Sequence, residues 1–508
     1  MSILKTMESE FDSLDLPIEE FKKLGYAVID MIAQYYEGIR EIPVSPNGSS
    51  AKIENLFREE LPVDGQSPDT VIAEWQDRIL PNATHLGSPR YFGFVNGSGS
   101  MIATLADALA SSVNMNSGAW KPGPGATEIE RITVKWLAQL IGYPDRCGGL
   151  IVSGGTMADF TALLTAFRNK ATEDTTNEGL QSTESNGRYR IYMSDHEGHI
   201  AIVRSADMMN LGRDAVRRVP SRDDFTMDTT ALDRMVREDI ASGDKPFCVV
   251  AQAGSINVGA IDPMEEIAAI CRKYDLWFHV DGACGAVGAM LPSLKPLYKG
   301  MELADSVTLD PHKWLYMPYE CGCLLVNDPE KLRRSFSIKA PYLRGTLPSE
   351  YDGLDFLEYG PQMSRGFKAL KLWMTLKHYG VKGYQKLLSQ NIACARHLHN
   401  LVKADENFQP AHEPRLYIYS FRYFPQDLRE EHDKSCINQY LDVLNQTIID
   451  KIQLSGLAFI MTSKVRNSVV IRMSVCSHRT TLEDIEIVFE KLAMLGQAID
   501  SKLRKTTA

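Results

Sequence analysis

From about residue 148 the sequence alternates short apolar runs with helical patterns, and this alternation restricts the fold more than any other feature. GLIVSGG is followed by TMADFTALLTAFRNKA, and KPFCVVAQAGS by PMEEIAAICRKYD; further apolar runs are RYRIYMS, LWFHV, SVTL and CGCLLV. Short apolar runs separated by helical segments are typical of buried parallel strands that helices cover. The alternation therefore predicts an α/β fold with a parallel or mostly parallel sheet.

Four residues that come just after predicted strands are candidates for a shared site. They are Gly154, Ser255, Asp281 and Lys313. In such sheets ligands bind at the edge where the carboxyl ends of the strands lie. We therefore expect these residues to meet at that edge.

The remaining sequence predicts a leading helix and a tail on either side of the α/β region. Apolar residues recur at helical spacing within 18–42, but this helix has no obvious core of its own and should pack on a neighbouring domain or subunit. Residues 340–362 lack periodicity and are a lid candidate. The predicted units are an N-terminal helical segment (1–98) that packs on the partner subunit, a large cofactor-binding domain (99–380) and a small α+β domain (381–508).

Composition excludes several classes of protein. The chain has 508 residues with 55 Lys and Arg against 65 Asp and Glu, and 44% are hydrophobic. The net charge of −10 argues against nucleic acid or an anionic membrane as the main partner, and the apolar content argues against intrinsic disorder. No stretch reaches the roughly 18 apolar residues of a membrane span. The nine cysteines include no C-x-x-C pair, so we expect reduced thiols and a cytoplasmic location.

Lys313 is the candidate nucleophile. It stands in Asp310-Pro311-His312-Lys313-Trp314, directly after the predicted strand SVTL. A lysine between His and Trp at the end of a buried strand should be partly desolvated. Desolvation lowers the pKa of an amine and frees it for Schiff-base formation.

Asp281 ends an apolar run and therefore needs a cationic partner or several hydrogen-bond donors. The protonated ring nitrogen of pyridoxal phosphate is one such partner, and the ion pair keeps the ring an electron sink. Capping of the following helix is the alternative interpretation.

Two further motifs are candidates for contacts with a cofactor. The turn Ser153-Gly154-Gly155-Thr156 opens a predicted helix, whose free N–H groups can bind a phosphate, although such a turn can also be a simple connection. His196-Glu197-Gly198-His199 lacks the spacing of H-E-x-x-H, so we expect no metal site. One of these histidines lying flat over a cofactor ring is chemically more useful.

In this order, SGGT at 153–156, His199, H-V-D at 279–281 and D-P-H-K-W at 310–314 resemble the group II decarboxylases that depend on pyridoxal phosphate. This fold-type-I family includes aromatic L-amino acid, histidine and glutamate decarboxylases. The resemblance covers nearly the whole chain, and the stretches ALKLWMTLKHYGVKG and VVIRMSVCSHRTTLEDI resemble the aromatic-acid branch most. It implies an aspartate-aminotransferase-like large domain, an N-terminal helical segment and a C-terminal α+β small domain.

The resemblance also implies roles for the matching residues. Lys313 would hold pyridoxal 5′-phosphate as the internal aldimine, Asp281 would pair with the pyridine nitrogen, and His199 would stack on the ring. The phosphate would meet Gly155, Thr156 and His312, with Asp310 nearby. The implied reaction of this carboxy-lyase is decarboxylation of an L-amino acid to an amine and CO₂, through an external aldimine and a quinonoid.

Tyr342 lies in the lid candidate and matches the mobile-loop tyrosine that protonates the quinonoid carbon in family decarboxylases. In this family a Phe at that position accompanies oxidative deamination to an aldehyde. Tyr342 therefore favours simple decarboxylation, with a role as a loop anchor as the alternative.

The predicted substrate pocket departs from the pattern of aromatic-acid members. Leu86 stands where many carry Trp, Gln252 replaces a small hydroxyl residue, and Val95-Asn96-Gly97 replaces an aromatic residue, Pro and a hydroxyl residue. Buried amides at Asn96 and Gln252 would need hydrogen-bond partners. An aromatic substrate (Trp, Tyr, Phe or DOPA) remains favoured. The predicted pocket also includes two further residues, Phe94 and, from the partner subunit's side of a dimer interface, Trp120.

Several alternatives stay open from the sequence. Within the family they are a non-aromatic substrate, such as glutamate or histidine, and an aldehyde-forming oxidative reaction. An aminotransferase would need an arginine for the substrate carboxylate, which Arg365 or Arg472 could supply. A cofactor-free structural or regulatory homologue is the alternative outside enzymes. Relatives are intertwined homodimers with composite sites, so we expect a homodimer, which would also give the leading helix a partner.

Overall fold

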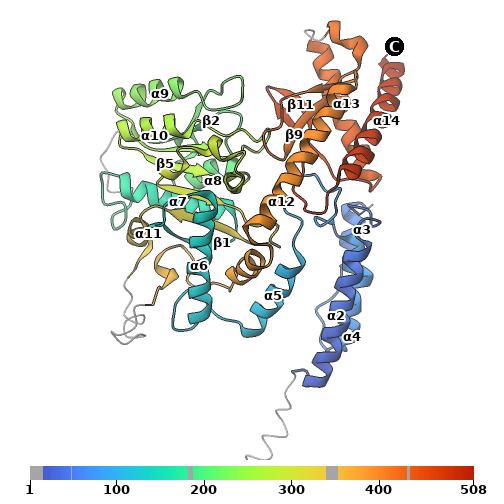
Figure 1. Cartoon of the computed structure of the whole chain (residues 1–508), viewed down its shortest axis with the longest axis horizontal. Coiled ribbons are helices and arrows are strands. Elements are labelled where there is room, and N and C mark those ends of the chain that lie inside the picture. The colour runs from blue at the N-terminus through green and yellow to red at the C-terminus, as the bar shows by residue number, and fades with distance from the viewer. Residues whose placement is uncertain (1–14, 47, 181–186, 339–352, 432–434, 508) are drawn as a thin grey trace, which may run out of the picture.

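The computed structural model describes residues 15–46, 48–180, 187–338, 353–431 and 435–507. In these residues two sheets form the centres of two parts of the molecule, which a long helix connects (Figure 1). The larger part holds seven strands in the order β1-β7-β6-β5-β4-β2-β3. They are β1 (Gly148–Val152), β2 (Tyr189–Ser194), β3 (Val216–Val219), β4 (Lys245–Gln252), β5 (Trp277–Asp281), β6 (Ser306–Leu309) and β7 (Gly322–Val326).

The large sheet is mostly parallel, as the alternating pattern predicts. Strand β7 pairs antiparallel with both β1 and β6, whereas the other described pairs are parallel. The connection from β6 to β7 contains no helix, and β7 returns antiparallel to β6. The short edge strand β3, with the sequence VRRV, was not predicted because it carries two arginines.

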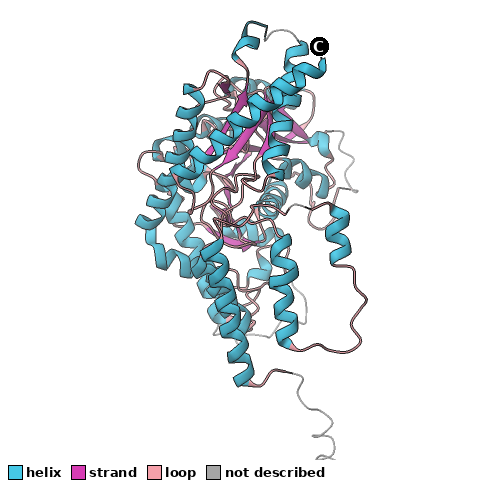
Figure 2. Cartoon of the chain, turned by 90° about the vertical axis from the view of Figure 1, so that its right-hand side faces the viewer, coloured by secondary structure: helices cyan, strands magenta, loops and turns pink. Residues whose placement is uncertain are grey.

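Helices cover both faces of this sheet. Along β1, Leu150 and Val152 belong to one apolar core and Ile151 to the other, because successive side chains of a strand point to opposite faces. The helices of this part are α6 (Pro124–Ile141), α7 (Gly155–Lys170), α8 (Ile200–Met208), α9 (Thr229–Ala241), α10 (Met264–Lys273) and α11 (Pro329–Phe336). Helices α6, α9 and α10 contribute to one apolar core and α7, α8 and α11 to the other. Figure 2 views the molecule from the side of the C-terminal part and shows helices around the strands there.

The C-terminal part contains an antiparallel sheet in the order β10-β11-β9-β8. Its strands are β8 (Phe408–Pro410), β9 (Ile418–Tyr423), β10 (Met461–Val465) and β11 (Ser468–Ser474), and its helices are α13 (Ser435–Leu454) and α14 (Leu482–Thr507). The connecting helix α12 (Ala369–Ala404) is interrupted at Gly380, whose φ of 61° favours glycine. The predicted domain boundaries stay predictions.

The N-terminal helices extend away from both sheets (Figure 1). Helix α2 (Ile18–Gly38) confirms the predicted leading helix, and Leu24 is its one buried residue. The other helices of this region are α3 (Ser50–Leu56), α4 (Pro68–Glu74) and α5 (Met101–Val113). Short helical turns of the chain are η1 (Trp75–Ile79), η2 (Leu80–Asn82), η3 (Arg213–Ala215), η4 (Ala286–Met290), η5 (Lys295–Tyr298), η6 (Met301–Leu303), η8 (Phe356–Glu358) and η9 (Gln426–Glu431).

Two further features of the described residues bear on function. None of the helices there is both long and apolar enough to cross a membrane. All nine cysteines are free thiols. Cys321 and Cys323 are buried beside or within β7, where they are small core residues.

Candidate active site

A cavity of about 440 Å³ lies at the carboxyl ends of the parallel strands. Most of the residues predicted for the site line this cavity, whereas Ser255, which was expected at this edge, does not. The predicted residues that line it are Phe94, Val95, Asn96, Ser153, Gly154, Gly155, Thr156, His199, Gln252, Asp281, Asp310, His312 and Lys313.

Lys313 is held by an ion pair inside this cavity. Its Nζ lies 2.9 Å from Oδ2 of Asp310 and 3.7 Å from Sγ of Cys284. Burial by itself lowers the pKa of Lys313, but the nearby acidic groups, Asp310 foremost, outweigh burial and raise the pKa well above its usual value. The prediction of a lowered lysine pKa is therefore wrong for the cofactor-free chain, because the sequence argument included desolvation but not the carboxylate three residues away.

Asp281 is buried at the end of β5 with few partners. Its Oδ1 accepts a hydrogen bond from the Ala283 N–H (3.2 Å), and no described Lys, Arg or His forms an ion pair with it. Burial raises the pKa of Asp281, and the neighbouring carboxyl of Asp159 raises it further. A cation placed against Asp281 would relieve both effects.

The glycine-rich turn forms an open helix N-terminus. No side chain caps α7, so the N–H groups of Gly155 and Thr156 at its start remain available to an anion. A Cβ at position 155 would lie 2.8 Å from Oδ2 of Asp310, which explains the glycine. Nδ1 of His312 accepts the Cys321 N–H (3.2 Å), so a neutral His312 ring carries its proton on Nε2. These groups, with Thr156, suit a phosphate.

His199 is fixed by its position at the N-terminus of α8. Its Nδ1 accepts the Ala201 N–H at 3.2 Å, so the helix holds the ring at the cavity wall. Among the described residues, no group of three or more His, Cys, Asp or Glu side chains is arranged to hold a metal ion.

The residues present therefore fit pyridoxal phosphate. The open helix N-terminus suits its phosphate, the buried and unpaired Asp281 suits its ring nitrogen, and Lys313 suits its aldehyde. The assigned role of each residue stays a prediction.

Two described residues of the predicted substrate pocket, Leu86 and Trp120, do not line the cavity. Leu86 lies elsewhere, and the Trp120 N–H donates to Oδ1 of Asp355 (2.8 Å). The proposed place of Trp120 in a partner's site stays a prediction. Tyr342 lies outside the described residues.

The cavity also contains residues that were not predicted as part of it. Asp159 follows Gly155 by one helical turn, a spacing from which it could have been found, whereas no sequence pattern indicates Tyr319. Nδ2 of Asn96 donates to the Tyr91 hydroxyl (3.0 Å), and its Oδ1 accepts from the Tyr319 hydroxyl (2.5 Å), which meets the predicted need for partners at Asn96. At Gln252 the need is not met, because its buried Nε2 has no described partner. Other unpredicted lining residues include Ile256 and Cys284. Arg472, which was considered for the carboxylate of an aminotransferase substrate, also lines the cavity.

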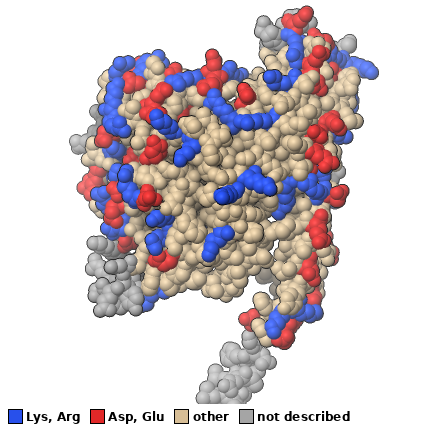
Figure 3. Space-filling model, in the orientation of Figure 1, with Lys and Arg blue, Asp and Glu red and all other residues tan. Residues whose placement is uncertain are grey.

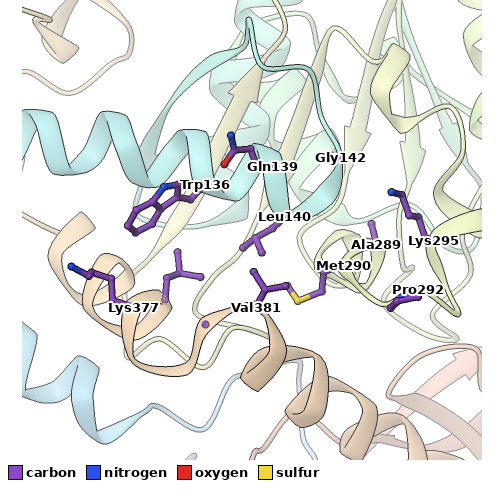
Figure 4. Close-up of a pocket in the computed structure, with 12 residues that line it drawn as sticks. Trp136, Gln139, Leu140, Gly142, Ala289, Met290, Pro292, Lys295, Lys377 and Val381 are labelled. Carbon is purple, nitrogen blue, oxygen red and sulfur yellow. The ribbon is translucent and has the colours of Figure 1, made fainter.

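A larger cavity of about 650 Å³ lies elsewhere, between α6, η4 and the break in α12 (Figure 4). Its wall is mostly apolar, and the chain contributes Lys295 and Lys377 to it. None of the predicted site residues lines it, so we assign the chemistry to the smaller cavity.

Comparisons with known proteins agree with this geometry. Residues 51–424 match the family model described as the pyridoxal-dependent decarboxylase conserved domain. The aromatic-L-amino-acid decarboxylase of Bacillus atrophaeus is 31% identical over 488 residues, which cover 96% of this chain and 98% of the relative. The chain therefore belongs to the pyridoxal-dependent decarboxylase family.

Solved structures show the same fold. The tryptophan decarboxylase of Catharanthus roseus, in complex with L-tryptophan, is 25% identical with a TM-score of 0.85. A protein from Oryza sativa named TDC, solved with PLP and tryptamine, is 23% identical with a TM-score of 0.88. Each match covers 96% of this chain and 100% of the other. The predicted family, fold type, enzyme class and cofactor are thus confirmed.

Proposed function

We propose that this enzyme converts an aromatic L-amino acid into its amine and CO₂. Arg472 supports an amino acid as the substrate, and membership of the decarboxylase family disfavours the aminotransferase for which such an arginine was also considered. The Arg472 side chain is buried in the wall of the cavity that contains Lys313, and no described carboxylate pairs with it. Its Nη1 donates to the Ile256 carbonyl (3.1 Å), while its Nε has no described partner. A buried guanidinium of this kind can bind the carboxylate of an amino acid.

The cofactor, when bound, supplies a ring that accepts the electrons left at the substrate's α-carbon as CO₂ departs. Oδ2 of Asp310 lies where it can take the proton that Nζ of Lys313 must lose before it binds an aldehyde. Asp281 would retain a proton on the ring nitrogen of the bound cofactor, and His199 would cover the ring.

The apolar part of the cavity supports an aromatic side chain. Val95 and Ile256 line it beside Phe94, whose ring stacks on Phe459 with centroids 6.3 Å apart. The paired side chains of Asn96 and Tyr319 add a polar edge. The relatives named above act on aromatic L-amino acids and on tryptophan, which favours the same substrate class here.

A homodimer in the cytoplasm completes the proposal. Met101, Leu105, Leu109 and Val113 recur every four residues along α5, and each is 46–55% exposed. Figure 3 shows few charges on the face of the molecule over α5 and α6. An exposed apolar stripe of this kind fits a second copy of the chain, and reduced thiols fit the cytoplasm.

The test is to incubate the protein and pyridoxal phosphate with the standard amino acids plus DOPA, and to identify products by mass. An amine from one or more aromatic amino acids is expected. An amine from glutamate or histidine would overturn the substrate class, and aldehyde with peroxide would favour the oxidative reaction. A colourless protein that takes up no cofactor would favour the non-enzymatic alternative.

A further inference from the structure

Asp159 lies in the wall of the same cavity and has no role in the function proposed above. It stands on α7 one turn after Gly155 and is 1% exposed. Its Oδ1 accepts a hydrogen bond from Oγ1 of Thr308 on β6 (2.7 Å) and lies 3.3 Å from Nε2 of His279 on β5. The carboxyl therefore ties the cofactor-binding helix to the two central strands.

A chain of buried hydrogen bonds continues behind His279. Nδ1 of His279 lies 2.8 Å from Oγ of Ser306, which accepts the indole N–H of Trp277 (2.9 Å). Burial lowers the pKa of His279 to about 4, so the ring is neutral at physiological pH and holds one proton. The contact between Nε2 of His279 and Oδ1 of Asp159 is a hydrogen bond only if one of these two atoms carries a proton. This series of hydrogen bonds fixes the position of the Asp159 carboxyl.

Asp159 also adds a second carboxyl to the cavity beside Asp281. The titratable groups that face them are His199 at the start of α8, Cys284 after β5, and Asp310 and Lys313 after β6. Lys313 and Asp310 pair with each other. Burial raises the pKa of Asp159 to about 6, against the opposing hydrogen bond from Thr308, so Asp159 is mostly ionised above that pH. This negative charge favours the protonated form of any basic group bound in the cavity.

We propose that Asp159 is a positioning residue for the protons of the bound cofactor. Its carboxyl contacts His279 and Thr308 of the sheet and places a second negative charge beside Asp281. This charge stabilises the protonated form of the cofactor and so raises the pH at which the cofactor loses its proton. The inference rests on pyridoxal phosphate binding at Lys313.

The experiment compares the visible absorbance of the purified holoenzyme and its Asp159→Asn variant from pH 5 to pH 10, without substrate. The asparagine keeps an acceptor for Thr308 and removes the charge. We expect the pH midpoint of the cofactor's absorbance to fall by about one pH unit, because a nearby negative charge no longer stabilises the protonated form. A wild-type midpoint above this range and a variant midpoint within it would also support the inference.

A second variant and a control distinguish a loss of the Asp159 charge from a general disturbance of the fold. Thr308→Val keeps the Asp159 carboxyl but removes a donor that favours its ionised form, so we expect a smaller shift in the same direction. Asp239→Asn removes a buried carboxyl that accepts from the Tyr192 hydroxyl (2.6 Å) outside the cavity, and should leave the midpoint unchanged.

Identical spectra in wild type and Asp159→Asn at every pH would overturn the inference. The substrate proposal would be unaffected, because no amino acid is present; failure of the wild type to bind the cofactor would instead overturn the site itself.

Discussion

Nζ of Lys313 lies 2.9 Å from Oδ2 of Asp310, while Oδ1 of the same carboxylate has no described hydrogen-bond partner. Both residues belong to one short motif after β6, so the ion pair is built into the local sequence. The carboxylate keeps the buried lysine charged and directed at the cavity until an aldehyde arrives. With Oδ1 unpartnered, the Asp310 carboxylate could take the proton that Lys313 would lose on binding an aldehyde.

Replacing Lys313 should abolish the covalent attachment of the cofactor. Lys313→Ala removes the amine that binds the aldehyde, so the absorbance band of the attached cofactor should disappear after dialysis and gel filtration, as measured by visible spectroscopy. Lys295→Ala, in the larger cavity, is the matched control and should keep the band. A band that persists in Lys313→Ala would mean that another lysine holds the cofactor.

Replacing Arg472 should weaken binding of the substrate but leave binding of the amine product almost unchanged. Arg472→Met removes the proposed partner of the substrate carboxylate, and charge-assisted hydrogen bonds contribute about 1.5–3 kcal/mol, so KM should rise about 10- to 100-fold. The amine product lacks this carboxylate, so its inhibition constant should change by less than about twofold. Steady-state kinetics with product inhibition measure both quantities, and equal losses in the two would refute the assignment.

The positions of Asp281 and Lys313 could be predicted from sequence because each residue ends or follows a recognisable strand. Asp281 ends a strand of five buried residues, and Lys313 follows a strand of four, so parallel pairing alone brings them to one edge. The phosphate turn was predictable for a similar reason, since a glycine pair precedes an amphipathic helix.

What could not be predicted depends on contacts between distant residues. Tyr319 reaches Asn96 across 223 positions, and no local pattern encodes that distance. The charge state of Lys313 was mispredicted because it depends on the balance between burial and carboxylates whose positions only the fold fixes. The spacing from Gly155 could have indicated that Asp159 lies in the cavity, but its partners, His279 and Thr308, lie on strands more than a hundred residues away and could not be predicted.

The stability of the cofactor-free protein should depend on pH through Asp159 and His279. Burial raises the pKa of Asp159 to about 6, so between pH 4 and 6 the native state binds a proton that the unfolded chain releases, and this contribution makes stability fall as pH rises. Burial lowers the pKa of His279 to about 4, which makes stability rise with pH up to about 6.5. The two contributions offset each other between pH 4 and 6.

Replacing either residue should therefore leave the pH dependence of stability that the other contributes. In Asp159→Asn, the free energy of unfolding should gain a slope relative to wild type of about +1.4 kcal/mol per pH unit between pH 4 and 6. In His279→Gln the relative slope should be of similar size and negative. Urea unfolding at four pH values in this window measures both, and parallel curves for all three proteins would contradict these pKa shifts.

Replacing Tyr342 tests the predicted balance between decarboxylation and oxidation. If its hydroxyl returns a proton to the α-carbon, Tyr342→Phe should slow amine formation and increase aldehyde, ammonia and hydrogen peroxide, with O₂ as the oxidant. A coupled peroxidase assay and mass spectrometry measure the partition, and catalase should remove the peroxide signal. An unchanged ratio of amine to aldehyde would show that Tyr342 is not the proton donor.

Introducing a charge into the apolar stripe of α5 should separate the subunits. Leu109 is 54% exposed in the single chain, and in the proposed dimer Leu109→Glu would bury an unpaired carboxylate at a cost of several kcal/mol, which raises the dissociation constant at least about 100-fold. Leu297→Glu is the control, because Leu297 is 44% exposed but lies on η5, outside the stripe. Sedimentation velocity should show wild type and Leu297→Glu at twice the chain mass of 56.8 kDa and Leu109→Glu shifted toward one chain. A wild-type protein that sediments as a single chain, or a Leu109→Glu dimer of unchanged affinity, would remove α5 from the interface.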